Sequence, residues 1–218
     1  MFTFSEENYL KAIFHLERKF PAGVSTNALA EEMETKASSV TDMIKKLSEK
    51  KLVNYKKYQG CKLSQLGLET AVSVIRKHRL WEFFLVEKLD FAWDEVHDIA
   101  EQLEHIKSEK LIDELDRFLN FPKLDPHGDP IPDAEGNFTI LNKVLLSDLK
   151  KGESGIFVGV KDSSAEFLQF LDKRNIALGN EIKIIEKEPF DQSVLIKINE
   201  KELRVSNLIS GNIYIKTT

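Results

Sequence analysis

The sequence contains very little cysteine: Cys61 is the only one among 218 residues. A single cysteine excludes a disulfide within the chain and fits a reducing compartment. The sequence also lacks any run of about 18 apolar residues, so we expect no membrane span. Its first residues, MFTFSEENYLKAIF, lack the basic stretch, the apolar run and the cleavage site of a signal peptide. These absences together predict a cytoplasmic protein.

The motifs that mark common enzyme classes are missing as well. The sequence has no HExxH zinc motif, no GxSxG nucleophile turn and no glycine-rich phosphate loop. We therefore expect no enzymatic activity, no catalytic residue and no small organic substrate. Hydrophobic residues make up 42% of the chain and charged residues 31%, which is ordinary for a globular protein. The length allows about one to three domains.

Charge is distributed unevenly, although the net charge is only −5. Residues 36–62 contain eight lysines and two acidic residues, whereas residues 65–120 contain seven basic and thirteen acidic residues. A basic segment within an acidic protein indicates a local contact with a polyanion, such as the phosphate backbone of DNA. A solvated lysine surface is the alternative explanation of the same pattern.

The N-terminal part shows the element order of a winged helix-turn-helix. Apolar periodicity predicts a helix over residues 5–19, with Ser5 as its N-cap, and a short helix over residues 25–33. A third helix is predicted over residues 37–50 and a β-hairpin over residues 52–64. In such a domain the third helix enters the major groove of DNA, and the hairpin, or wing, follows the phosphate backbone.

The same pattern predicts finer features of this domain. Glu6 and Glu7 fall in the first turn of the first helix, where negative charge suits the helix dipole. Ser38 or Ser39 is expected to cap the third helix. The side chains expected to pack inward from the first and third helices are Tyr9, Ile13, Leu16, Phe20, Val40, Ile44 and Leu47.

The exposed side of the third helix and the wing carry groups that suit DNA. Hydroxyls and amines near a helix N-terminus bond to base edges and phosphates, and lysines on a wing neutralise backbone phosphates. The residues predicted to contact DNA are Lys36, Ser38, Ser39, Thr41, Asp42, Lys45, Lys46, Lys56, Lys57 and Tyr58.

The rest of the chain changes from helical to β-rich. Helices are predicted over residues 65–89, 93–106 and 108–119. Residues 120–138 hold four of the six prolines, which indicates a linker or an ordered loop. A small SH3-like barrel with one inserted helix at 164–175 is predicted from strands at residues 155–161, 181–187, 193–199, 201–206 and 212–216. The predicted fold class is mainly α with a β-structured C-terminal part.

The segment EVHDIAEQLEH, residues 95–105, gathers metal-binding side chains on one face of its predicted helix. At i, i+4, i+7 and i+8 this face carries His97, Glu101, Glu104 and His105. On the preceding long helix, His78 and Glu82 share a face at i, i+4. Imidazole nitrogens and carboxylate oxygens are ligands of first-row divalent metals, so a metal site is one interpretation. A solvated helix surface is the other.

These segments resemble the diphtheria toxin repressor and manganese transport regulator family of metal-dependent transcription factors. The resemblance covers essentially the whole chain and rests on SEENYLKAIFHL, SSVTDMIKKL, RKHRLWEFFL, VHDIAEQLEH and FPKLDPHGDPIP. It implies a homodimer that binds double-stranded operator DNA and represses metal-uptake genes when Mn²⁺, or in second place Fe²⁺, is plentiful. It implies a winged helix-turn-helix DNA-binding domain at 1–64, a helical dimerisation and metal-binding domain at 65–122, a linker at 123–150 and an SH3-like, FeoA-like domain at 151–218.

The resemblance implies two metal sites per subunit. Iron-type members have a cysteine at the position of Glu101 and a methionine at that of Asn8, whereas manganese-type members have carboxylates at both. The Glu101 oxygen therefore favours Mn²⁺. Lys11 stands where some manganese-type members carry a second acidic residue, which argues against two ions in this site. The implied ligands of the primary site are Asn8, His78, Glu101, Glu104 and His105.

The implied secondary site resembles that of three-domain streptococcal members, which have cysteine at the position of Asp125. Its residues are Glu82, Asp125, His127 and Asp162, with His97 as a ligand or as a residue that orients one. The iron-type version would combine His78, Glu82 and His97 with Ser163 and Glu166. The primary ion would fix the angle between the DNA-reading units, and the secondary ion would hold the SH3-like domain. A winged-helix regulator of a small organic ligand and a metal-dependent hydrolase are the alternative functions.

Overall fold

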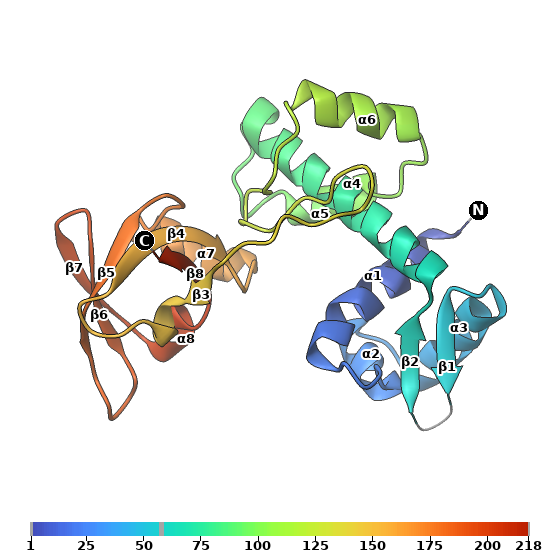
Figure 1. Ribbon diagram of the computed structural model, residues 1–218, viewed down its shortest axis with the longest axis horizontal. Helices are drawn as coiled ribbons and strands as arrows, with labels where there is room; N and C mark the ends of the chain where they lie inside the picture. The colour runs from blue at the N-terminus through green and yellow to red at the C-terminus, as the bar shows by residue number, and fades with distance from the viewer. Residues whose placement is uncertain (1, 57–58, 218) are drawn as a thin grey trace. The chain divides into compact units, whose positions relative to one another are not determined.

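The structure is a computed structural model that describes residues 2–56 and 59–217 (Figure 1). The chain forms two compact units, each assembled from separate segments, and the long helix α4, Gln65–Leu89, contributes to both. The first unit consists of Met1–His78, Glu101–Leu115 and Pro132–Asn137. The second unit consists of Arg79–Ala100, Asp116–Ile131 and Phe138–Thr218.

The first unit contains the predicted winged helix-turn-helix. Strands β1 and β2 pair antiparallel beside the helices (Figure 1). Val24 pairs with Cys61 of β2 in an isolated β-bridge. The predicted order of elements is therefore present. These elements are α1 (Phe4–Lys19), α2 (Thr26–Glu32), α3 (Ala37–Glu49), β1 (Val53–Lys56) and β2 (Gly60–Leu63).

The helix caps differ from two of the predictions. Thr3, not Ser5, caps α1, because Thr3 and Glu6 form a reciprocal capping box: Glu6 N–H donates to Thr3 Oγ1 and Thr3 N–H donates to Glu6 Oε2. Helix α3 begins after Lys36 without a side-chain cap, so the expected caps at Ser38 and Ser39 were wrong. These two serines instead lie in the first turn, exposed to solvent.

The core of this domain follows the predicted stripes. Val40, Ile44 and Leu47 of α3 are fully buried, and Tyr9, Ile13 and Leu16 of α1 are buried against them in one cluster. Phe20 is the exception, since 44% of it is exposed where the chain leaves α1. Burial of one face of α3 leaves its opposite face, which carries amines and hydroxyls, open to solvent.

Of the helices that follow the wing, the first and third match the prediction, while the second is shorter at both ends than the predicted range 93–106. Helix α4 has the predicted ends, and α6 spans Glu109–Phe118. Helix α5 spans only His97–Leu103, so Glu104 and His105 lie in the turn after it and not on its face. Their side chains are buried and bonded to residues of α4 and α1. None of the described helices combines the length and the apolarity needed to span a bilayer.

The C-terminal part of the second unit is a six-stranded antiparallel sheet in the order β3-β8-β4-β5-β6-β7. Phe157, Ile184 and Ile213 are among the fully buried side chains of its core. The five predicted strands are present, while the edge strand β3 and the short helix α8 were not predicted. The elements are β3 (Val144–Leu145), η1 (Leu146–Asp148), β4 (Ser154–Val160), α7 (Ala165–Asp172), β5 (Glu181–Lys187), β6 (Val194–Ile198), β7 (Lys201–Val205), α8 (Asn207–Ser210) and β8 (Ile213–Thr217).

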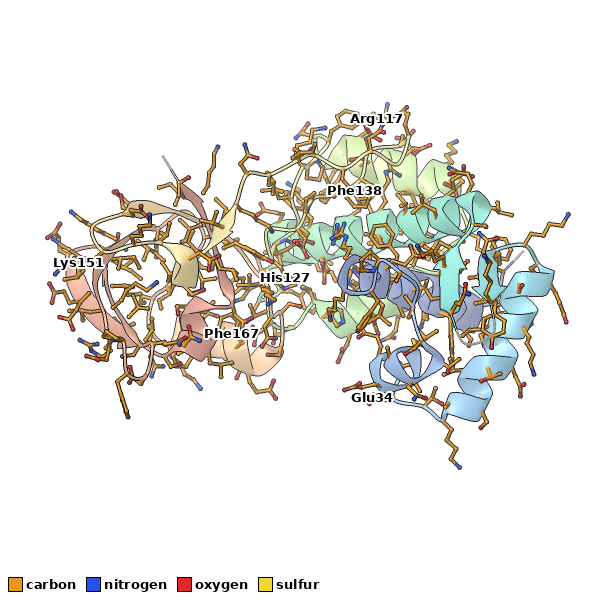
Figure 2. The ribbon with its side chains drawn as sticks, turned by 60° about the horizontal axis from the view of Figure 1, so that its bottom comes forward. Glu34, Arg117, His127, Phe138, Lys151 and Phe167 are labelled. Carbon is orange, nitrogen blue, oxygen red and sulfur yellow. The ribbon has the colours of Figure 1, made fainter. Side chains whose placement is uncertain are left out.

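The proline-rich segment is an ordered loop where it crosses the second unit. Asp125 N–H donates to the Asp129 carbonyl, and Val160 N–H of β4 donates to the His127 carbonyl. Gly128 has a φ of +82°, and a Cβ there would overlap the Val158 carbonyl, so only glycine allows the loop to lie against β4. This contact fixes the backbone that carries Asp125 and His127. His127 is labelled in Figure 2.

Candidate metal sites and DNA interface

The first candidate site surrounds Glu104, whose side chain is fully buried. His78 of α4 donates from Nδ1 to Glu104 Oε2 at 2.6 Å, and Lys11 of α1 donates to the same oxygen at 2.8 Å. The Lys11 ammonium also lies 3.3 Å from Glu101 Oε1. Burial raises the pKa of Glu104, but the hydrogen bond from His78 and the charge of Lys11 outweigh it and hold that pKa below its usual value. Glu104 is therefore an ionised, partnered carboxylate.

His105 is oriented by a residue that the sequence did not single out as part of the site. Its Nδ1 donates to Glu7 Oε2 at 2.6 Å, and the ring of Phe4 stacks on it at 4.5 Å between centroids. A proton held at Nδ1 leaves the lone pair at Nε2, which lies 3.9 Å from Glu104 Oε1. Glu7 thus selects the ring nitrogen that is available as a ligand, an arrangement typical of metal-binding histidines.

Two buried side-chain oxygens of the predicted ligands accept no hydrogen bond from any residue that the structure describes. They are Asn8 Oδ1 and Glu104 Oε1. An unpartnered buried oxygen costs free energy, about 1–3 kcal/mol, and a cation offsets that cost. Oxygen and imidazole nitrogen are ligands that suit Mn²⁺ or Fe²⁺, and ligation of one ion by these oxygens and His105 Nε2 stays a prediction. The predicted residues Asn8, His78, Glu101, Glu104 and His105 all belong to the first unit.

The predicted ligands of the primary site are not gathered into a tight cluster, and two of their carboxylates bond Lys11. Among the described residues, no set of three His, Cys, Asp or Glu ligand atoms lying within 4.8 Å of one another includes Glu104 or His105. The Lys11 ammonium bonds both carboxylates that a cation would bind, Glu101 and Glu104. Glu7 and Lys11 were the groups of this site whose contacts the sequence did not reveal. The family resemblance had already placed Lys11 at this site, whereas the only signal for Glu7 was its position one residue before Asn8.

The second candidate site lies in the second unit and does meet the distance criterion. Glu82 of α4 and the linker residues Asp125 and His127 are each at least 94% buried, and their ligand atoms all lie within 4.8 Å of one another. His127 Nε2 donates to the Trp93 carbonyl at 2.8 Å, and its Nδ1 lies 3.7 Å from Glu82 Oε2. The carbonyl of Trp93 therefore leaves Nδ1 as the nitrogen that faces the carboxylates.

The two carboxylates of this group, Glu82 and Asp125, repel one another. Burial, and then the nearby Glu82 carboxylate, raise the pKa of Asp125 to about 7. Burial lowers the pKa of His127, but the Glu82 and Asp125 carboxylates outweigh it and raise that pKa to about 9. Arg79 Nε lies 3.4 Å from Asp125 Oδ2, which offsets part of the repulsion. A buried carboxylate with a raised pKa beside a second carboxylate is a site that a divalent cation stabilises.

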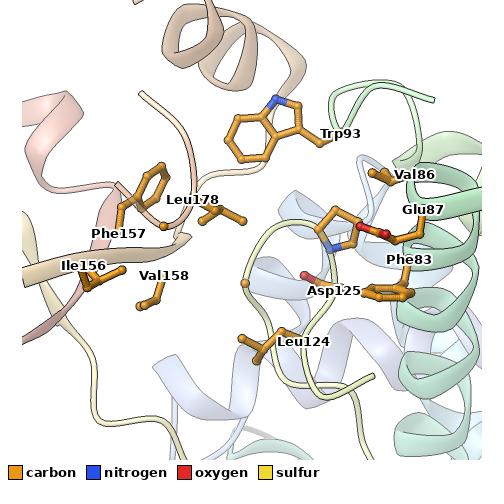
Figure 3. A pocket seen from close by; sticks show the side chains of 13 residues that line it. Phe83, Val86, Glu87, Trp93, Leu124, Asp125, Ile156, Phe157, Val158 and Leu178 are labelled. Atoms are coloured by element: carbon orange, nitrogen blue, oxygen red, sulfur yellow. The ribbon is translucent and has the colours of Figure 1, made fainter. Parts of the chain in front are cut away.

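A cavity of about 480 Å³ adjoins this group in the second unit. Phe83 and Trp93 line it, and Asp125 is among its few polar lining residues (Figure 3). Apolar walls beside a carboxylate keep the local dielectric low, which strengthens the repulsion between Asp125 and Glu82.

Two predicted residues of the secondary site lie at its margin or outside it. His97 is half exposed, with Nδ1 3.5 Å from Glu82 Oε1. Asp162 is not part of the buried group, and its Oδ1 accepts a hydrogen bond from the Ser164 backbone at 2.9 Å. The geometry brings together Glu82, Asp125 and His127, while ligation by Asp162 stays a prediction.

The predicted DNA-contact residues form an exposed surface on α3 and β1. Thr41 is half-buried and donates to the Ala37 carbonyl, and Lys45 lies 3.4 Å from Asp42. Lys46 differs from the others because its ammonium lies 2.9 Å from the buried Glu6 carboxylate. Lys57 and Tyr58 lie outside the described residues. The exposed members of the set are Lys36, Ser38, Ser39, Asp42, Lys45, Lys46 and Lys56.

Three family models match the chain in succession. The iron dependent repressor N-terminal DNA binding domain matches residues 1–61. The iron dependent repressor metal binding and dimerisation domain matches residues 64–133, and the FeoA domain matches residues 144–217. Together they account for nearly the whole sequence.

Individual proteins show the same relationship. A solved structure described as a manganese-dependent transcriptional repressor complex with manganese is 30% identical, with a TM-score of 0.86 over 98% of this chain and 100% of that one. The iron-dependent repressor IdeR of Mycobacterium leprae is 32% identical over 126 residues, 58% of this chain and 54% of that protein. A probable metal transport system membrane protein of Chlamydia trachomatis is 42% identical over 86 residues, 39% of this chain and 19% of that protein. The chain thus spans about half of one curated relative and a fifth of the other.

A winged helix-turn-helix joined to buried carboxylate and imidazole groups defines a metal-dependent DNA-binding regulator. The chain belongs to the family of metal-dependent transcriptional repressors that includes the diphtheria toxin repressor and MntR. Because the members of this family are DNA-binding repressors and not enzymes, the hydrolase alternative is set aside.

Proposed function

We propose that the chain is a Mn²⁺-responsive repressor of metal-uptake genes that acts as a homodimer on operator DNA. The observation that carries this proposal is the composition of the first unit. Helix α1 of the DNA-reading domain contributes Glu7 and Lys11 to the same buried group as Glu104 and His105. A change in this group therefore acts directly on the domain that would bind DNA.

The residues of the primary group have separable roles in this proposal. Asn8 Oδ1, Glu104 Oε1 and His105 Nε2 would hold the ion, because the two oxygens have no hydrogen-bond partner among the described residues and the nitrogen lies 3.9 Å from Glu104 Oε1. Glu7 keeps the His105 ring in the ligating orientation. When bound, the ion supplies positive charge that both α1 and the turn after α5 can share. A regulator of this kind needs only about 1.4 kcal/mol of differential metal binding for a tenfold gain in DNA affinity.

Manganese is favoured over iron by the chemistry of the donors. The primary group offers oxygen and imidazole nitrogen, and Cys61, the only cysteine, is fully buried within the winged-helix core. Hard oxygen donors suit Mn²⁺, whereas softer sulfur donors shift preference away from it. The related proteins include both a manganese-dependent and an iron-dependent repressor, so the donor set is what supports the choice.

A homodimer is supported by exposed apolar side chains on the helices that follow the wing. Leu89 at the end of α4 is 51% exposed, and Phe118 at the end of α6 is 62% exposed. Large exposed apolar side chains often mark a surface that another protein chain covers. The family model that matches residues 64–133 describes a metal binding and dimerisation domain. Two copies would present two α3 helices to half-sites about one helical turn, roughly 34 Å, or a multiple of it apart.

The test is fluorescence anisotropy with a labelled duplex that the protein selects from a random library in the presence of Mn²⁺. Binding would be measured in EDTA, in Mn²⁺, and in Fe²⁺ without oxygen. We expect tight binding only with metal, and Mn²⁺ to act at the lower free concentration. Glu104→Gln should remove the response, whereas the exposed Glu109→Gln serves as a matched control.

Each other outcome selects a different function. A stronger response to Fe²⁺ than to Mn²⁺ would assign the protein to iron control. Equal binding in EDTA and in metal would refute the metal switch and favour a regulator of a small organic ligand.

A further inference from the structure

Helix α1 carries a second buried carboxylate, Glu6, on the side away from the primary metal group. At about 100° per residue, Glu7, Asn8 and Lys11 lie roughly 100°, 200° and 140° around the helix from Glu6. The metal-facing residues therefore share one side of α1, and Glu6 points to the other. Glu6 is fully buried, although it stands only two positions into the helix from Phe4.

Glu6 holds the C-terminal end of the recognition helix α3. Lys50 donates to both of its oxygens, at 2.7 and 3.0 Å, and Lys46 lies 2.9 Å from Oε1. Lys46 and Lys50 stand at i, i+4 and thus on one face of α3. The pKa of Glu6 is about 2, since these two lysines and the Thr3 backbone N–H outweigh the effect of burial. Two cations on one buried carboxylate make a firm link between α1 and α3.

We propose that Glu6 is a positioning residue that transmits the state of the primary metal group to the recognition helix. This inference rests on the proposed metal-dependent DNA binding. One side of α1 bonds Glu104 and His105 through Lys11 and Glu7, and the other side bonds α3 through Glu6. A displacement of α1 by the metal group must therefore move α3, or break the ion pairs of Glu6.

A purely structural role makes a different prediction, because Glu6 also belongs to the capping box of α1. Glutamine preserves a capping box, since its side-chain oxygen still accepts from the Thr3 N–H. Glutamine lacks the charge that binds Lys46 and Lys50. Glu6→Gln therefore removes the link to α3 and keeps the start of α1.

The experiment measures the ratio of the DNA dissociation constant in EDTA to that in saturating Mn²⁺, with the selected duplex described above. We expect Glu6→Gln to lower this ratio at least fivefold relative to the unmodified protein. Its Mn²⁺ affinity without DNA, measured by calorimetry, should stay within twofold. Glu49→Gln is the matched control, because Glu49 is an exposed acid beside Lys50 on α3. It should leave both quantities unchanged.

A second variant guards against a folding defect in the first. Lys50→Gln keeps Glu6, its capping box and the Lys46 contact, and it should lower the ratio by a smaller factor, about twofold or more. An unchanged ratio in both variants would overturn the proposal. Tighter binding of Glu6→Gln in EDTA and Mn²⁺ alike, with a steeper salt dependence, would also overturn it, since Glu6 would then only mask two phosphate-binding lysines. If the unmodified protein itself shows no metal dependence, the proposed function fails instead.

Discussion

Replacing Asp125 by asparagine should stabilise the protein in EDTA, although it removes a predicted metal ligand. The carboxylate of Asp125 is 94% buried beside Glu82, and its pKa rises from 3.8 to about 7. A carboxyl group with a raised pKa in the folded state favours folding only while it is protonated. The stability of the unmodified protein is therefore lost as the pH rises from about 4 to about 7.

The size of the effect follows from the pKa and from the contacts that the substitution keeps. A shift from 3.8 to about 7 corresponds to roughly 4 kcal/mol above pH 7, at 1.36 kcal/mol per pKa unit. Asparagine still accepts hydrogen bonds at Oδ1 from the backbone of His127 and Asp129. The pKa of about 7 already includes the attraction of Asp125 to Arg79 and His127, so the loss of that attraction is not subtracted a second time. We expect a gain in the free energy of unfolding of up to about 4 kcal/mol at pH 8 and of about 1–2 kcal/mol near pH 5.

Urea denaturation followed by tryptophan fluorescence measures this effect, because both tryptophans, Trp81 and Trp93, belong to the second unit. The titrations would be made in EDTA at pH 5 and pH 8, and again with Mn²⁺. Mn²⁺ should stabilise the unmodified protein more than it stabilises Asp125→Asn. The difference in the free energy of unfolding between the two proteins should therefore shrink or change sign when Mn²⁺ is added. A variant that is less stable in EDTA at pH 8 would refute the reasoning, since the hydrogen bonds and Arg79 would then outweigh the repulsion.

Three further outcomes follow from other groups. Lys11→Met should lower the free energy of unfolding in EDTA by about 1–3 kcal/mol, because it leaves the buried Glu104 with fewer partners. Denaturation followed by circular dichroism measures this change, and an unchanged value would mean that the Lys11–Glu104 ion pair does not stabilise the fold. Lys56→Ala should weaken binding to every DNA sequence and reduce the slope of log affinity against log salt by about 0.9, whereas loss at one sequence alone would contradict a phosphate contact. The Cys61 thiol is fully buried, and burial together with the nearby Glu17 charge raises its pKa to about 11. It should react with a disulfide reagent at pH 8 at least about 100-fold faster in the unfolded protein than in the folded protein, and equal rates would contradict its burial.

The predictions from sequence succeeded where a local pattern decides the outcome. The ends of α4 at Gln65 and Leu89 were predicted because a long apolar periodicity is bounded by a turn on each side. The stripe of Val40, Ile44 and Leu47 was predicted for the same reason, since burial of one face needs no knowledge of the partner. The order of the winged helix-turn-helix followed from these elements.

The predictions failed where a distant side chain decides. Glu104, just after the end of helix α5 at Leu103, bonds His78 and Lys11, groups that are 26 and 93 positions away in the sequence. Glu6 and Glu7 looked like equivalent acids of a first helical turn, which suits the helix dipole. In the structure one of them holds α3 and the other holds His105. Spacing along one helix shows which side chains share a face, but not which partner each face meets.

The two candidate metal sites differ in how far nearby positive charges and hydrogen-bond donors neutralise their carboxylates. This difference suggests that the two sites bind metal at different concentrations. In the primary group Glu7 bonds His105, and Glu104 bonds Lys11 and His78, so a cation must compete with existing partners there. In the linker group the raised pKa of Asp125 shows that its charge is not fully balanced. We therefore expect the linker group to take up a divalent ion at the lower concentration and to stay filled. The primary group, which lies on α1 of the DNA-reading unit, is left to respond when the metal concentration rises.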